Sequence, residues 1–327
     1  MYPDIEPFDT RMIPVSPCHS LYVERSGTPG GYPIFFLHGG PGSQTRAIHR
    51  RYFDPQFFEI VLFDQRGCGR SVPAGETREN TTSLLADDIH AIRDALGITR
   101  NISLLGGSWG STLALAYALR YPQSLDELIL RGVFLGTQAE VDWYTQGLSR
   151  FAPEAWAQFA CAGATDLVEY YYQAVNDADD KRAAKAAVRW ANYEMQIMAT
   201  MTIGAGGAAS KSLTQTSLPS GTVVQDTLHS TRVHLHYLRH QCFLAGSPLL
   251  DAAHTIELPV TLVQGRMDLV CPPITAWHLS QRLPFARLRM VDNAGHGATS
   301  GSLALALKEE VDALRDRLIS QSAGGKR

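Results

Sequence analysis

The chain has 327 residues, of which 45% are hydrophobic and 19% are charged, a composition typical of a globular protein with a sizeable core. Its formal charge of −3 gives no sign of the basic surface that binds nucleic acid or anionic membranes. The five cysteines form no C-x-x-C pair, so neither a zinc site nor a disulfide framework is indicated. Because no apolar run is long enough to span a membrane and no secretory signal is recognisable, we expect a soluble, cytoplasmic protein.

Short apolar runs that end in glycine-rich or polar segments recur along the chain. Such runs are typical of buried parallel strands, and we expect strands at 33–38, 59–64, 101–105, 126–131, 259–264 and 286–291. Apolar residues at helical spacing lie between several of them and predict helices at 83–96, 109–120, 274–283 and 302–319. This alternation predicts the α/β class, with a doubly wound and mostly parallel sheet.

The alternation stops between residues 138 and 245. This segment has no strand-like run, and we expect helices at 139–151, 154–161, 165–175, 180–201 and 225–245. Because it falls between strands of one sheet, at the end where ligands bind, we interpret 138–245 as a helical cap over the active site. Residues 1–137 and 246–327 would then form the catalytic core. The small, polar stretch 203–222 is expected to be a mobile loop.

The strand at 101–105 is followed by Gly106-Gly107-Ser108-Trp109-Gly110, which matches the pattern G-x-S-x-G. Such a sequence forms a sharp turn between a strand and a helix, and its glycines let neighbouring backbone pass close by. The serine then lies at the apex, where the N-terminus of the next helix favours negative charge. Ser108 is therefore the candidate nucleophile.

A serine hydroxyl needs a base to take its proton, usually a histidine that a carboxylate orients. In chains with this turn the acid and then the histidine follow the serine, each after a later strand. Asp268 and His296 each come after one of the last two expected strands. Asp251 and Asp292 compete for the role of the acid, but Asp292 would share the loop of the histidine. We expect Asp268 and His296 to complete a triad with Ser108.

Two glycines follow the first apolar strand in the segment HGGPG at 38–42. They would let a backbone N–H face the substrate carbonyl as it becomes an oxyanion, and we assign that donor to Gly40. The N–H of Trp109, which follows the nucleophile, would be the second donor. The segment DQRGCGRS at 64–71 is interpreted as structural, with charged side chains that brace the oxyanion loop from behind.

Three long motifs together resemble the proline iminopeptidases: HGGPG at 38–42, DQRGCGRS at 64–71 and GGSWGSTLALAYA at 106–118. The late Asp268 and His296 fit the same family, and the resemblance extends over nearly the whole chain. These enzymes are α/β-hydrolase serine peptidases that remove an N-terminal proline. The resemblance implies the α/β-hydrolase fold, an acyl-enzyme, no metal or organic cofactor, and a small peptide substrate.

The resemblance also implies how the substrate is held. The family has a Trp-x-x-Trp-Glu element on a cap helix, and the match here begins at Trp190 and ends with Tyr193 and Glu194. Trp190 and Glu194 are four residues apart and share a helix face, so an aromatic wall would stand beside a carboxylate. A second glutamate of the family is replaced by His234, and an imidazole holds an ammonium group less well than a carboxylate does.

Other functions stay open at this point. An esterase or amidase of the same fold would keep the triad and act on a small ester or amide, and His234 favours this alternative. A non-catalytic receptor on a hydrolase scaffold could retain the triad and bind a ligand without turnover. A dehalogenase is disfavoured, because the turn carries Ser108 in place of an aspartate. The sequence gives no indication of the oligomeric state.

Overall fold

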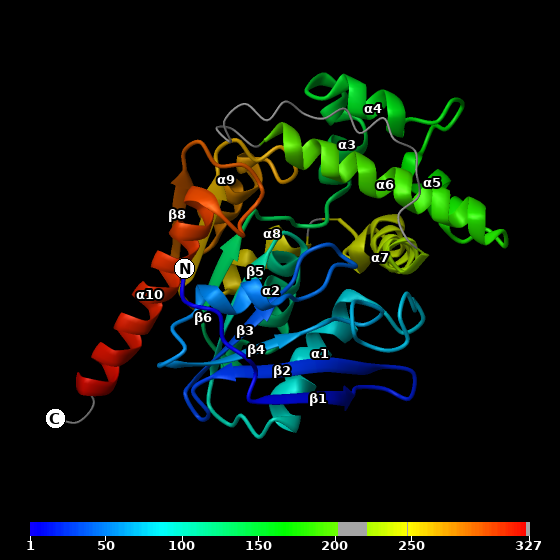
Figure 1. Cartoon of the computed structure of the whole chain (residues 1–327). Helices are drawn as coiled ribbons and strands as arrows, with labels where there is room; N and C mark the ends of the chain where they lie inside the picture. The colour runs from blue at the N-terminus through cyan, green and yellow to red at the C-terminus, as the bar shows by residue number, and fades with distance from the viewer. Residues whose placement is uncertain (202–220, 247, 325–327) are drawn as a thin grey trace.

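The computed structural model describes residues 1–201, 221–246 and 248–324, and it is built around an eight-stranded β-sheet (Figure 1). The strands lie in the order β1-β2-β4-β3-β5-β6-β7-β8. β1 pairs antiparallel with β2, and β2 pairs antiparallel with β4, while the other neighbours are parallel. The strands are β1 Asp9–Pro14, β2 Ser20–Gly27, β3 Tyr32–Leu37, β4 Phe58–Phe63, β5 Ile102–Gly107, β6 Leu125–Arg131, β7 Val260–Gly265 and β8 Ala286–Val291.

The six strands expected from the sequence are β3 to β8, and their ends agree within two residues. β1 and β2 were not expected, because charged residues interrupt their apolar patterns. β1 is mostly exposed at the edge of the sheet, and β2 buries Glu24 in its centre. The Glu24 carboxylate is paired there with Arg50 at 2.7 Å, which allows a charge to occupy a buried strand position.

Helices cover both faces of the sheet and produce two hydrophobic cores. The helices outside the long insertion are α1 Thr82–Ala95, α2 Trp109–Arg120, α8 Pro248–Ala252, α9 Pro273–Arg282 and α10 Gly301–Gly324. Side chains of α1, α2 and α9 fill one core, and α10 fills the other. Successive residues of β3 alternate between the two, since Phe35 belongs to the first core and Phe36 to the second. The central strands are therefore buried on both faces.

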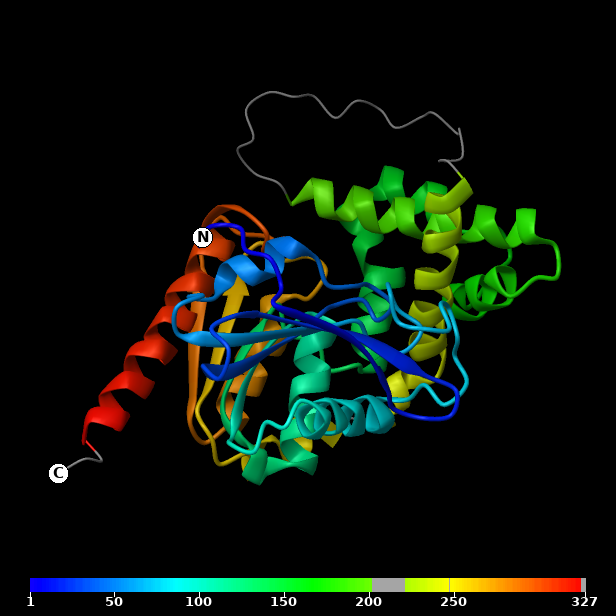
Figure 2. The same cartoon turned by 60° about the horizontal axis from the view of Figure 1, so that its bottom comes forward.

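The insertion at residues 138–245, which falls between β6 and β7, consists of helices and their connections in its described part. These helices are α3 Gln138–Thr145, α4 Pro153–Phe159, α5 Leu167–Val175, α6 Asp180–Thr200 and α7 Gly221–Arg239. Figures 1 and 2 show them gathered together on one side of the sheet, away from α10. The division into a core and a cap at residues 138–245 stays a prediction. No helix in the described ranges is long and apolar enough to cross a membrane.

Two of the expected helices end six residues earlier than the sequence pattern suggested. The helix expected at 139–151 ends at Thr145 and is followed by a separate 3-10 turn, Gly147–Arg150. The helix expected at 225–245 ends at Arg239, because the turn Gln241–Phe243 has positive φ angles that no α-helix can contain. Most of the expected loop at 203–222 lies outside the described residues.

Candidate active site

Ser108 lies at the turn between β5 and α2, as the sequence predicts. Its backbone angles, φ 58° and ψ −125°, are unusual for a residue with a side chain and place it at the apex of a sharp turn. A Cβ at Gly110 would collide with the carbonyl group of Leu37, so only glycine lets α2 begin this close to β3. The turn is also tied to the neighbouring strand, because the Ser108 N–H donates to the carbonyl oxygen of Arg131 at 2.8 Å.

Asp268 and His296 are brought together by the loops after β7 and β8. The distance from His296 Nδ1 to Asp268 Oδ2 is 2.7 Å, and both residues are buried. The other Asp268 oxygen, Oδ1, accepts the N–H groups of Val270 and Cys271 at 3.0 and 2.9 Å. These bonds fix the direction in which the carboxylate points. Asp292 pairs instead with Arg266 at the surface, so its position does not support its candidacy as the acid.

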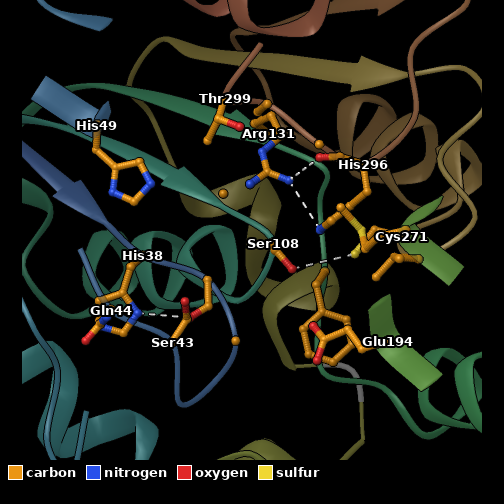
Figure 3. A pocket seen from close by; sticks show the side chains of 18 of the residues that line it. His38, Ser43, Gln44, His49, Ser108, Arg131, Glu194, Cys271, His296 and Thr299 are labelled. Atoms are coloured by element: carbon orange, nitrogen blue, oxygen red, sulfur yellow. Dashed lines mark hydrogen bonds between the residues drawn. The ribbon is translucent and has the colours of Figure 1, made fainter. Parts of the chain in front are cut away.

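Arg131, at the end of β6, is a third side chain that contacts this pair. Its Nη1 lies 3.2 Å from His296 Nε2 and donates to the His296 carbonyl oxygen at 2.9 Å (Figure 3). Because a guanidinium can only donate, Nε2 is the acceptor and the ring proton lies on Nδ1, facing Asp268. The imidazole is therefore in the tautomer that a general base for serine requires.

The Ser108 hydroxyl is not hydrogen-bonded to His296 within the described ranges of the chain. The polar contact recorded for its Oγ is the Cys271 Sγ, 4.0 Å away (Figure 3). Catalytic hydrogen bonds are often long or absent without substrate, so this arrangement is compatible with proton transfer once a substrate displaces Arg131 from Nε2. Burial raises the pKa of the Cys271 thiol well above its usual value, which keeps it protonated.

The segment at 38–42 passes directly beside the nucleophile. A Cβ at Gly39 would lie 3.3 Å from the Ser108 Cβ. Gly40 has φ +118°, and a Cβ there would lie 2.6 Å from the Gly42 nitrogen, so this turn requires glycine. The assignment of the oxyanion donors to Gly40 and Trp109 stays a prediction.

Gln65 connects the oxyanion loop to the serine turn, and sequence reasoning did not identify this role. Its backbone N–H donates to His38 Nε2 and its side-chain Nε2 donates to the His38 carbonyl, both at 3.0 Å. Its Oε1 accepts the indole N–H of Trp109 at 2.9 Å. Gln65 therefore holds both segments that carry the predicted oxyanion donors.

Asp64 holds the same loop from behind. It accepts the N–H and hydroxyl of Thr45 at 2.8 and 2.6 Å, and Arg70 Nε at 2.7 Å. Burial would raise the pKa of Asp64, but the hydrogen bond from Arg70 and the neighbouring His38 and Thr45 hold it below the usual value. These contacts agree with the interpretation of segment 64–71 as a brace.

A cavity of about 290 Å³ opens beside Ser108 and His296, and we call it the front cavity. Glu194 from α6, His234 from α7 and Tyr144 from α3 line it on the side of the helical insertion. Figure 3 shows Ser108 between Arg131 and Glu194 in that view. Burial raises the pKa of Glu194 and lowers that of His234 to about 4, so His234 is neutral at pH 7.

The other two predicted substrate-binding residues do not line the front cavity. Tyr193 is buried against Phe159, with stacked rings 4.0 Å apart, and its hydroxyl donates to the Tyr144 carbonyl. The prediction for Tyr193 is therefore corrected. Adjacent residues of an α-helix point about 100° apart, so Tyr193 points into the core while Glu194 lines the cavity. Trp190 is buried as well and lines a second cavity behind Glu194.

The aromatic side chains that do line the front cavity next to Ser108 include Phe134 and Tyr144.

No group of three or more metal-ligating side chains occurs in the parts of the chain that the structure describes.

Comparison with known proteins gives consistent relatives. Residues 32–299 match the family model described as alpha/beta hydrolase fold. The chain is 38% identical to a probable proline iminopeptidase of Leptolyngbya boryana, over 100% of this chain and 99% of that protein. It is 37% identical to a proline iminopeptidase of Neisseria gonorrhoeae, over 98% of this chain and 100% of that protein.

Solved structures share the fold at lower sequence identity. An esterase from Rhodococcus has a TM-score of 0.61 at 17% identity, covering 94% of this chain and 98% of its own. The proline iminopeptidase of Mycobacterium smegmatis has a TM-score of 0.58 at 19% identity, covering 97% and 100%. With the full-length relatives, these matches show that the chain belongs to the proline iminopeptidase family of α/β hydrolases.

Proposed function

We propose that this serine hydrolase releases N-terminal proline from small peptides, with Ser108, Asp268 and His296 as its catalytic triad. The observation that carries the proposal is the position of Glu194, which lines the same cavity as the candidate nucleophile. A carboxylate there can pair with the cationic nitrogen of an N-terminal residue while the neighbouring carbonyl reaches Ser108.

Glu194 is the carboxylate in this cavity best placed for that task. Glu140 also lines the cavity, but its oxygens accept the N–H groups of Leu135 and Thr137 and the Thr137 hydroxyl. In the described residues the Glu194 carboxylate has no such partner, and a bound ammonium would compensate for its burial. The apolar side chains of Phe134 and Leu238 supply surface for a proline ring.

The reaction follows from the geometry. The Ser108 oxygen attacks the carbonyl carbon of the N-terminal residue, and His296 Nε2 takes its proton. The N–H groups of Gly40 and Trp109 would stabilise the oxyanion, and Asp268 stabilises the imidazolium. His296 then protonates the leaving amine, and water resolves the ester to release the amino acid. No metal ion or organic cofactor takes part in this scheme.

The second candidate is an esterase or amidase that acts on a small ester or amide. The observation that favours it is His234, because a neutral imidazole beside Glu194 leaves the cavity with less negative charge than two carboxylates would give. The two candidates share the triad and differ in the use of Glu194.

We also propose a cytoplasmic location. All five cysteines are described, and each is free, although Cys68, Cys242 and Cys271 are buried. Free thiols suit a reducing compartment, and a chain that functions there needs no disulfide.

The test compares prolyl-p-nitroanilide, alanyl-p-nitroanilide and p-nitrophenyl acetate, with Ser108→Ala as the blank. The proposal expects kcat/KM for the prolyl substrate to exceed that for the alanyl substrate by about tenfold or more, since the ring adds apolar contact worth about 1–3 kcal/mol. Cleavage of the ester without cleavage of either anilide would reject the peptidase and favour the second candidate.

A further inference from the structure

A second cavity, which we call the rear cavity, lies behind Glu194 and His234. It has a volume of about 470 Å³ and shares Ser43, Gln44, Glu194 and His234 with the front cavity. Its remaining walls include Ala191 of α6, the α7 residues Asp226, Thr227 and Ser230, and the loops after β3 and β4. Side chains that line both cavities therefore separate the space that would receive an N-terminal residue from the rear cavity.

Glu194 and His234 form the partition between the two cavities. His234 has no hydrogen bond to any described residue, and its recorded neighbour is the Trp190 ring, whose centroid is 5.4 Å from that of the imidazole. No hydrogen bond in the described structure therefore fixes the imidazole, and a substrate that extends into both cavities would have to displace it. Since burial lowers the pKa of His234 to about 4, the ring is neutral and can exchange a hydrogen bond with an uncharged amide.

The rear cavity is long enough for additional residues. It follows α7 from His234 back to Asp226, eight residues along the helix, which corresponds to about 12 Å at about 1.5 Å per residue. An extended peptide advances by about 3.4 Å per residue, so two or three residues would fit over this length.

The lining of the rear cavity suits a peptide that ends in an ammonium group. Asp226 supplies a carboxylate at the far end, and Thr227 and Ser230 supply hydroxyls between it and His234. In the described structure Asp226 has no ion pair. Arg70, which lines the same cavity, pairs with Asp64 at 2.7 Å and donates to the Thr45 hydroxyl at 2.7 Å. Asp226 is therefore free to bind an ammonium group.

We propose that the rear cavity binds residues that precede the scissile proline, so that the enzyme also releases X-Pro dipeptides from the N-terminus of peptides. This inference rests on the proposed function, because it uses the same triad. Ser108 forms an ester with the prolyl carbonyl, the bond to the leaving amine breaks, and His296 gives that amine the serine proton. Water then hydrolyses the ester, the dipeptide leaves, and Ser108 regains its proton.

The partition fits this substrate chemically. The proline nitrogen of an X-Pro dipeptide is an uncharged amide without a hydrogen, so it needs no carboxylate beside it. Neutral His234 can donate to the carbonyl of the preceding residue, and the raised pKa of Glu194, caused by burial, eases its protonation next to an amide.

The experiment measures p-nitroaniline release from Ala-Pro-p-nitroanilide and Pro-p-nitroanilide, with the other product identified by mass spectrometry. We expect intact Ala-Pro from the first substrate. Ala191→Phe fills the rear cavity and should lower kcat/KM for Ala-Pro-p-nitroanilide by about tenfold or more, through steric exclusion, and leave Pro-p-nitroanilide within about twofold. Ala191→Ser is the matched control and should leave both substrates unchanged.

Asp226→Asn provides a second variant at an exposed position. It should raise KM for Ala-Pro-p-nitroanilide by about three- to tenfold, the loss expected for a partly solvated charge pair, and leave Pro-p-nitroanilide unchanged. If Ala191→Phe loses activity on both anilides, Asp226→Asn becomes the variant that tests whether the rear cavity binds the substrate.

Four results would overturn the inference. Separate alanine and proline would mean that residues leave one at a time, and no release from Ala-Pro-p-nitroanilide alongside cleavage of Pro-p-nitroanilide would mean that the front cavity is closed. Both results leave the proposed function intact. Dipeptide release that neither Ala191→Phe nor Asp226→Asn reduces would place the extension elsewhere. Failure to cleave either anilide would reject the inference and the proposed function together.

Discussion

The polar groups that support Ser108 on the core side of the front cavity and the side chains of Tyr144, Glu194 and His234 on its helical side differ in how firmly they are held. On the core side, Asp268, His296 and Gln65 each make hydrogen bonds that fix their orientation. On the helical side, the buried hydroxyl of Tyr144 and the side chains of Glu194 and His234 have no hydrogen-bond partner among the described residues.

This difference separates chemistry from recognition. Groups that must meet a transition state gain from being oriented in advance, because reorientation would add to the barrier. Groups that bind a substrate can become ordered when the substrate arrives. A ligand can then supply the hydrogen bonds that buried polar atoms lack. Changes on the core side should therefore lower kcat, and changes on the helical side should alter KM and substrate choice.

The largest expected effect is at the nucleophile. Ser108→Ala should lower kcat for prolyl-p-nitroanilide by about 10⁴-fold or more, and it should abolish labelling by a fluorophosphonate. Cys271→Ala is the matched control, since its sulfur lies 4.0 Å from the same oxygen but its raised pKa keeps the thiol protonated. Labelling that persists in Ser108→Ala and disappears in Cys271→Ala would reverse the assignment.

The next effect concerns the residue that joins the two oxyanion segments. Gln65→Ala should lower kcat by about 10- to 100-fold, somewhat less than the loss of a full oxyanion donor, and leave KM within about threefold. Gln281→Ala, at an exposed glutamine, controls for the substitution itself. A rise in KM with unchanged kcat would show that Gln65 acts on substrate binding instead.

On the helical side, recognition should depend on pH through Glu194. Burial raises the pKa of this carboxyl, so it takes up a proton at a higher pH than an exposed glutamate does. Protonated Glu194 carries no charge to pair with an ammonium, and KM for prolyl-p-nitroanilide should therefore rise as the pH falls through that pKa. KM for p-nitrophenyl acetate, which has no ammonium, should stay constant over the same range.

The smallest expected effect is at the neutral partner of Glu194. His234→Glu should lower KM for prolyl-p-nitroanilide by about two- to fivefold, because the added negative charge is partly offset by repulsion from Glu194 and by proton sharing between the two carboxyls. His234→Gln is the uncharged control and should leave KM unchanged. An unchanged or higher KM in His234→Glu would place the substrate ammonium away from this position.

The same contrast explains what the sequence could predict. Ser108, Asp268 and His296 each follow a strand of the parallel part of the sheet, and parallel strands bring their ends to one edge of the sheet, so their meeting could be expected. Arg131 ends a recognised strand too, but a single charged residue has no spacing that distinguishes it from an ordinary strand end. Its contact with His296 depends on how two loops fold back.

Positions on the helical side were harder to predict because they depend on helix rotation. The spacing of Trp190 and Glu194 placed them on one face, but it could not say that Glu194 reaches the front cavity while Trp190 faces the rear cavity. Tyr193 was assigned to the substrate and lies in the core. Tyr144 was missed, since nothing in its local sequence separates a tyrosine that lines a cavity from one that packs inside.

The most direct test of this separation is Glu194→Gln, assayed with prolyl-p-nitroanilide and p-nitrophenyl acetate. We expect kcat/KM for the prolyl substrate to fall by about 10- to 100-fold, the loss expected for a hydrogen bond to a charged group, while ester hydrolysis stays within about twofold. An equal loss on both substrates would mean that Glu194 supports the catalytic side, and no loss on either would mean that it does not hold the substrate nitrogen.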